Sequence, residues 1–205
     1  MNYSNEFYRL AQELIAAGRF IDQKGWVPAT SGNFSARLLD GTIALTVSGK
    51  HKGQLNPEDL MLVDINAHAL DGKKPSAEVL LHTRLYQRFP GVNAVLHPHS
   101  MSATLVSKLF TQALILEDYE LLKALPTITT HASRVIIPIF ENDQDISRLS
   151  ACVDQYFDQH ADVCAYIIVG HGFYTWGGSV QETLQFVEAL DFLFECELRL
   201  YRVKN

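Results

Sequence analysis

The segment that most constrains this chain is 94–100, Ala-Val-Leu-His-Pro-His-Ser, an apolar run of strand type that ends in two histidines. Residues i and i+2 of an extended chain point to the same side, so His97 and His99 can reach one point. A second apolar run, 167–172, ends in Gly-His-Gly and supplies His171 as a third candidate ligand. Imidazole nitrogens bind Zn²⁺ at roughly 2.0 to 2.1 Å. The pattern therefore favours a zinc site over the alternative, buried histidines that are only hydrogen-bonded.

Hydrophobic periodicity predicts an α/β fold around these two runs. Branched and apolar residues predict strands at 34–37, 42–47, 60–65, 94–97, 135–139 and 167–170. Spacings of three and four predict a helix that Ser4 caps and Gly18 ends, and further helices that open at Ser76, Ser100, Asp145 and Ser179. Hairpin-like strands followed by alternating strands and helices indicate an α/β sandwich and not a pure Rossmann pattern.

Two turn-rich segments are candidates for binding an anion. Ser31-Gly32-Asn33 can direct backbone N–H groups and an amide at a phosphate, although most such turns only reverse the chain. The segment 48–53, Ser-Gly-Lys-His-Lys-Gly, combines a hydroxyl, a glycine and two lysines. A phosphate site and a solvated basic hairpin tip explain that segment equally well.

Two carboxylates, Glu78 and Glu120, are candidates for acid–base catalysis. Glu78 follows Ser76, the expected N-cap, so it should lie in the first turn of a helix. There it could complement the helix dipole or be presented to a cleft. Glu120 stands beside two leucines, which is also the pattern of a charge on a solvated helix face.

Composition limits the classes of function. The chain has 205 residues, is 47% hydrophobic and carries a formal charge of −6, which predicts one domain, residues 1–205, with a single core. The absence of a dense Lys/Arg run argues against nucleic-acid and membrane partners. The N-terminal sequence lacks the features of a signal peptide, so we expect a cytoplasmic protein. The three cysteines lack CxxC spacing and are expected to be small buried hydrophobes.

These segments together resemble the class II aldolase and adducin family, which includes fuculose 1-phosphate aldolase and ribulose 5-phosphate 4-epimerase. The resemblance runs from the first helix to the last and is carried by Ser31-Gly-Asn33, Val47-Ser-Gly49, Pro75-Ser-Ala-Glu78, His97-Pro-His-Ser100 and Gly170-His-Gly172. It implies a three-layer sandwich with a mainly antiparallel central sheet flanked by helices. It also implies a homotetramer with zinc sites near the subunit contacts.

The resemblance also implies roles for single residues. His97, His99 and His171 match the ligands of one zinc ion per subunit. Positions that bind the substrate phosphate in the aldolases are matched by Asn33, Ser48, Gly49 and Ser76. Ala77 departs from the aldolase pattern, which has a second serine there, so that Lys50 could supply the missing phosphate contact.

Within the family, the chain is most similar to a dehydratase branch that removes water from a methylthio-substituted ketose 1-phosphate in methionine salvage. This similarity is carried by the Glu120 segment, residues 138–142, Trp176-Gly177 and residues 188–198 of the C-terminal helix. It favours Glu120 as the proton carrier, with Glu78, the acid/base of the aldolases, as second choice. The expected activity is thus that of a zinc-dependent lyase with a small sugar-phosphate substrate. The alternatives are a sugar-phosphate aldolase or 4-epimerase and, more remotely, a non-catalytic binding module like the adducin head.

Overall fold

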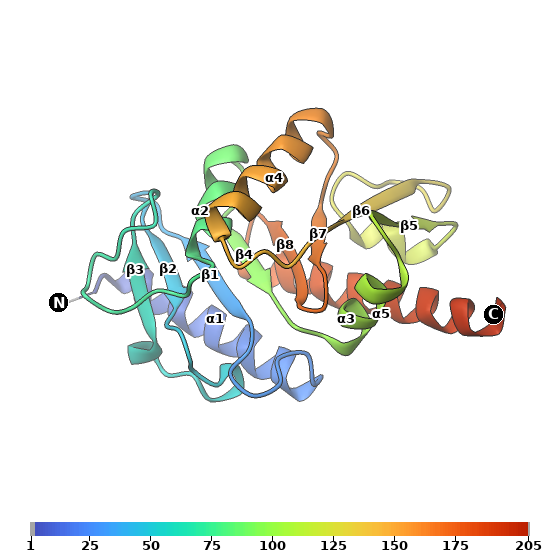
Figure 1. Cartoon of the computed structure of the whole chain (residues 1–205). Coiled ribbons are helices and arrows are strands. Elements are labelled where there is room, and N and C mark those ends of the chain that lie inside the picture. The colour runs from blue at the N-terminus through green and yellow to red at the C-terminus, as the bar shows by residue number, and fades with distance from the viewer. Residues whose placement is uncertain (1–2, 205) are drawn as a thin grey trace.

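An eight-stranded sheet forms the middle of the computed structural model, which describes residues 3–204 (Figure 1). The strand order is β3-β2-β1-β4-β8-β7-β6-β5, and β6 with β7 is the one parallel pair. The strands are β1 (Asn33–Arg37), β2 (Ile43–Thr46), β3 (Leu60–Val63), β4 (Ala94–His97), β5 (Ala113–Glu117), β6 (Arg134–Phe140), β7 (Ala165–Ile168) and β8 (Gly172–Gly177). The expected α/β fold with a mainly antiparallel sheet is confirmed.

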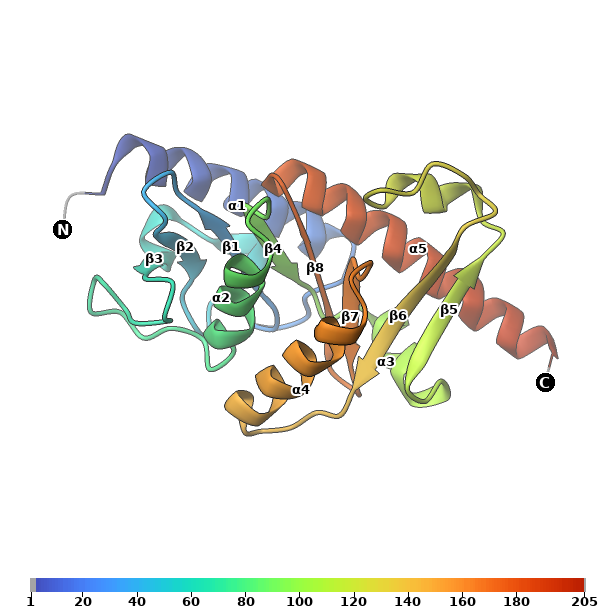
Figure 2. The same ribbon diagram turned by 90° about the horizontal axis from the view of Figure 1, so that it is seen from above.

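Helices cover both faces of the sheet, as the three-layer expectation requires (Figure 2). The helices are α1 (Asn5–Gln23), α2 (Val79–Arg88), α3 (Met101–Leu109), α4 (Ile146–Gln159) and α5 (Val180–Lys204), with the short 3-10 helices η1 (Lys52–Gln54), η2 (Pro57–Asp59) and η3 (Glu120–Ala124). Buried residues of α1, α3 and α5 form one apolar cluster with the sheet, and those of α2 and α4 form another. The alternation of side chains along each strand divides the core in this way.

Polar caps at the helix starts follow the sequence prediction, with one exception. The hydroxyls of Ser4 and Ser100 accept hydrogen bonds from the third backbone N–H after them, which satisfies a donor that the helix leaves open. The exception is Ser76, because α2 begins three residues later, at Val79, and Glu78 is its N-cap residue. The Ser76 hydroxyl accepts instead from the Glu78 N–H at 3.3 Å, within a turn that precedes the helix. This turn directs the side chains of Ser76 and Glu78 to Asn33, the first residue of β1.

Gly18 does not end α1, as its sequence position had suggested, because the helix continues to Gln23. The reason for a glycine at this position is a close contact. A Cβ atom there would lie well inside the van der Waals contact distance to the Lys52 carbonyl oxygen. Gly18 therefore allows η1 to pack directly against the backbone of α1. Within residues 3–204, none of the helices has the length and apolar character needed to cross a membrane.

We predict that Gly18→Ala destabilises the protein even though alanine is the better helix former. The added methyl group overpacks the contact with Lys52, and overpacking typically costs about 1 to 3 kcal/mol. Urea unfolding measures the change, with Ala16→Gly as the control. Ala16 lies on the exposed face of the same helix, where glycine should cost about 0.5 to 1 kcal/mol. A stabilised Gly18→Ala variant would contradict the close packing of η1 against α1.

Candidate metal centre

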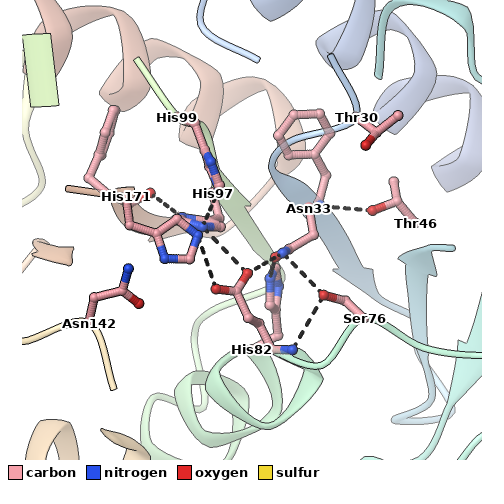
Figure 3. A network of polar contacts seen from close by, with 12 residues as sticks. Thr30, Asn33, Thr46, Ser76, His82, His97, His99, Asn142 and His171 are labelled. Atoms are coloured by element: carbon pink, nitrogen blue, oxygen red, sulfur yellow. Dashed lines mark hydrogen bonds and ion pairs between the residues drawn. The ribbon is translucent and has the colours of Figure 1, made fainter. Parts of the chain in front are cut away.

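Three imidazoles and one carboxylate converge at the ends of β4 and α2 and in the turn between β7 and β8 (Figure 3). His97 is the last residue of β4, His99 follows it, and His171 precedes β8. Glu78 is the N-cap residue of α2. One possible ligand atom from each of these residues lies within 4.8 Å of those from the other three. The prediction that His97, His99 and His171 meet is thus confirmed, although His171 lies more than seventy residues along the chain from the other two.

The nitrogen and oxygen atoms in this cluster face one another closely. The Nε2 atoms of His97 and His99 are 2.9 Å apart. The two carboxylate oxygens of Glu78 divide between neighbours, with Oε2 at 3.5 Å from His97 Nε2 and Oε1 at 3.3 Å from His171 Nε2. Neutral imidazoles that point their nitrogens at one another cannot all donate a proton, so this arrangement leaves lone pairs directed at a shared point.

Burial prepares these imidazoles to bind a cation. Burial is the main cause that lowers the pKa of His97 and His99 well below the usual range, and the nearby imidazoles lower both pKa values further. Both rings are therefore neutral near pH 7. The Nδ1 of His97 lies 2.8 Å from the Phe173 carbonyl oxygen, which can only accept, so Nδ1 carries the proton and Nε2 keeps its lone pair. This tautomer is the one that binds a metal through Nε2, and the cluster fits a metal ion.

An aromatic stack holds the His97 ring in position. The ring lies against Tyr174 of β8 with centroids 3.9 Å apart and an angle of 11° between the planes. The Tyr166 ring of β7 stacks in turn on Tyr174, with centroids 4.8 Å apart and the same angle of 11° between the planes. The rings are fully buried, so rotation of the imidazole would require the core to open. The His97 ring is thus fixed both by packing and by its hydrogen bond.

Asn33 links the cluster to a chain of buried hydrogen bonds. Its Nδ2 donates to Glu78 Oε2 at 2.6 Å, and its Oδ1 accepts from His82 Nε2. Burial lowers the pKa of His82 to about 4, so this ring is neutral, and with Nε2 protonated its Nδ1 accepts from Ser35 Oγ at 2.7 Å. The Tyr86 hydroxyl lies 2.8 Å from the same Ser35 oxygen. Because His82 Nε2 donates to Oδ1, the Asn33 amide is held with its NH₂ group toward the Glu78 carboxylate.

A small cavity of about 160 Å³ opens beside the carboxylate and His99. It is lined by the four residues expected to contact a phosphate, Asn33, Ser48, Gly49 and Ser76. They come from β1, from the turn after β2 and from the turn before α2. The structure therefore brings these four residues together next to the histidines.

Two other predicted site residues lie elsewhere in the chain. Lys50 is half-exposed and forms an ion pair with Asp59 at 2.8 Å, outside the lining of the cavity. Glu120, at the start of η3, has a side chain that is 75% exposed and pairs with Lys123 at 2.6 Å. It is not part of the cluster of Glu78 and the three histidines. The three cysteines are free, and Cys164 is buried as expected, whereas Cys152 is exposed.

Sequence reasoning missed two residues that border this site. His82 stands four residues after Glu78, a spacing that places both on one side of a helix and could have indicated the pair. Lys52 lines the cavity and is buried, whereas the sequence had drawn attention to its neighbour Lys50. Two lysines separated by one residue carry no signal that tells which of them is buried.

Comparison with known proteins gives close relatives along the whole chain. The family model described as Class II Aldolase and Adducin N-terminal domain matches residues 12–198. A methylthioribulose-1-phosphate dehydratase of Methylococcus capsulatus is 62% identical over 203 residues, which cover 99% of this chain and 100% of that protein. The enzyme of the same name from Pseudomonas syringae pv. syringae is 53% identical over 199 residues, 96% of this chain and 98% of the relative.

Solved structures show the same fold at lower identity. An L-fuculose-1-phosphate aldolase from Thermus thermophilus superposes with a TM-score of 0.77 at 24% identity, over 97% of this chain and 98% of the aldolase. A sugar-phosphate aldolase from Thermotoga maritima superposes with a TM-score of 0.70 at 17% identity, over 97% of each chain. At these identities, the likeness shows the fold alone.

We predict that His97→Ala and His171→Ala each abolish the retention of a divalent metal. Each variant removes one of three imidazoles, and two remaining ligands hold such an ion far more weakly. Metal content after chelator treatment and reloading measures the effect. His68→Ala is the control, because His68 is exposed and pairs with Asp64 away from the cluster. Wild-type metal content in both folded variants would rule out this centre.

Proposed function

The chain belongs to the class II aldolase and adducin family, and from that membership we propose that it dehydrates methylthioribulose 1-phosphate, a reaction of methionine salvage. One observation carries the proposal, the 62% identity over nearly the full length to a dehydratase of that name. The product would be the 2,3-diketo-5-methylthiopentyl 1-phosphate. The chain is accordingly a lyase.

The three histidines supply the metal site of this proposal. They would hold one ion per protomer, and we propose zinc because neutral imidazoles in a site with an open position suit it. The ion would act as a Lewis acid that polarises the substrate carbonyl and stabilises negative charge on oxygen by several kcal/mol. The stacked ring of His97 and its bond to Phe173 keep the ligand set rigid.

The cavity beside the cluster would receive the substrate phosphate. Ser48 and Ser76 offer hydroxyls, Asn33 offers its amide, and Gly49 has a φ of 75°, a conformation that suits glycine. Hydrogen bonds to a charged phosphate are about twice as strong as neutral ones, so a few of them fix the ketose in one orientation. The carbon chain would then extend toward the histidines.

Glu78 is the proton carrier that the geometry of one protomer favours. Its carboxylate borders both the imidazoles and the cavity, and Asn33 orients it. In the proposed step, Glu78 removes the C3 proton, and its protonated form then gives that proton to the departing C4 hydroxyl, which leaves as water. The enol that remains tautomerises to the diketone. A positioned carboxylate of this kind typically contributes about 10²- to 10⁴-fold.

Glu120 has a role in this proposal only through a second copy of the chain. Its carboxylate is exposed on η3, outside the cluster of its own protomer. A homotetramer with metal sites near subunit contacts, as proposed for this chain from the family resemblance, could bring it to the cluster of a neighbour.

The reaction is tested by incubating metal-loaded protein with methylthioribulose 1-phosphate and following the product by mass. We expect loss of one water and an intact carbon skeleton. Cleavage into two fragments, or turnover of fuculose or ribulose phosphates alone, would contradict the dehydratase and indicate aldolase or epimerase chemistry on the same fold.

The proton carrier is tested by comparing Glu78→Gln with Glu120→Gln. We expect Glu78→Gln to lower kcat by about 10²-fold or more and to retain the metal, because the amide keeps the shape but cannot accept the proton. Glu120→Gln should retain most activity. The reverse result would assign the step to Glu120 and would require a second copy of the chain at each site.

A further inference from the structure

Lys52 is the one lysine of residues 3–204 whose side chain lies fully inside the protein, with a relative exposure of 1%. It is the first residue of η1, and its Nζ donates to the carbonyl oxygens of Thr30 at 3.1 Å and Lys50 at 2.7 Å. An ammonium has three N–H donors, so two carbonyls do not exhaust it.

The charge of this lysine has no anionic partner in the described part of the chain. No carboxylate oxygen of residues 3–204 lies within 4.0 Å of Nζ. Lys50, two residues earlier, is in contrast paired with Asp59 at 2.8 Å. Burial of a cation without a counter-ion is costly, and it lowers the pKa of Lys52 to about 8. Such a cost is offset when an anion binds beside the group.

The side chain borders the cavity that holds the other phosphate candidates. Lys52 lines it together with Ser48, Gly49 and Ser76. The cavity has a volume of about 160 Å³. This is the volume of several water molecules at about 30 Å³ each, so a phosphate group fits in the cavity. A cation, two hydroxyls and a glycine turn are the components of a site for a dianion.

The backbone of Lys52 is held firmly in place. The Lys52 carbonyl oxygen rests on Gly18 of α1, where a larger residue would collide with it. Both carbonyls that accept from Nζ belong to the loops that border the cavity. The ammonium is thus positioned before any ligand arrives, which lowers the entropic cost of binding.

We infer that Lys52 is the counter-ion of the substrate phosphate, and that it makes the site selective for phosphorylated ketoses. The inference rests on the proposed function and assigns to Lys52 the contact that the sequence had suggested for Lys50. A neutral donor could hydrogen-bond the two carbonyls without the free-energy cost of burying a charge, so bridging them does not by itself explain a lysine at this position.

The direct test is calorimetric titration of metal-loaded protein with inorganic phosphate, for the wild type, Lys52→Met and Lys50→Met. Methionine keeps the length of the side chain and removes the charge. We expect Lys52→Met to weaken phosphate binding at least about tenfold and Lys50→Met to leave it within about twofold. Lys52→Gln, which retains a donor for the two carbonyls, replaces Lys52→Met if that variant does not fold.

Three outcomes would overturn the inference. They are equal phosphate affinity in Lys52→Met and the wild type, loss of affinity in Lys50→Met in place of Lys52→Met, and no phosphate binding by the wild type. The first would mean that phosphate binds elsewhere, for example at the metal. Because the titration does not depend on turnover, Lys52-dependent phosphate binding in a protein without dehydratase activity would reject the proposed function and retain the role of Lys52.

Kinetics separate a binding role from a structural one. We expect Lys52→Met to raise KM for methylthioribulose 1-phosphate at least about tenfold with the metal content unchanged. A structural role alone would lower stability toward urea and leave KM unchanged, and that result would contradict the inference.

Discussion

The close approach of two backbone segments determines everything else at this site. The turn before β8 lies so near the end of β4 that a Cβ at Gly172 would overlap the Pro98 carbonyl oxygen and stand 3.1 Å from the His97 ring. The Phe173 N–H donates a hydrogen bond to the Pro98 carbonyl oxygen at 3.2 Å, and the Phe173 carbonyl oxygen accepts one from His97 Nδ1. Two segments more than seventy residues apart are thereby joined by hydrogen bonds, and three imidazoles are brought into one small space. The neutrality of His97 and His99 follows from their burial.

Much of this arrangement could be predicted from the sequence, because it depends on local rules. The spacing of His97 and His99 on an extended segment, the glycines around His171 and the serine caps of α1 and α3 all express short-range geometry. Gly18 was misjudged because its role is a contact with η1, a partner more than thirty residues away. Gly172, beside His171, lets the backbone at Pro98, just after β4, approach closely, which is also a contact between distant segments.

The residues that the sequence left undecided are side chains whose surroundings only the folded chain defines. Lys50 and Lys52 have the same chemistry, and the packing of η1 against α1 decides which of them is buried. Glu120 resembles a proton carrier in its sequence context, yet its exposed side chain at the start of η3 is outside the cluster of His97, His99 and His171 in its own chain. His82 belongs to a buried network with Asn33 and Ser35 that no pattern in one segment could indicate.

The pairing of β1 with β4 places Asn33 directly opposite His97. A shift of one residue between these strands would turn alternate side chains to the other face of the sheet, and it would separate the Asn33 amide from the His97 ring at the same time. A chain that paired β1 with β4 out of register would lose the Asn33 amide that orients Glu78 beside the imidazoles. In the proposed metal centre, an ion that binds this cluster would therefore thermodynamically favour the correctly aligned sheet over misaligned ones.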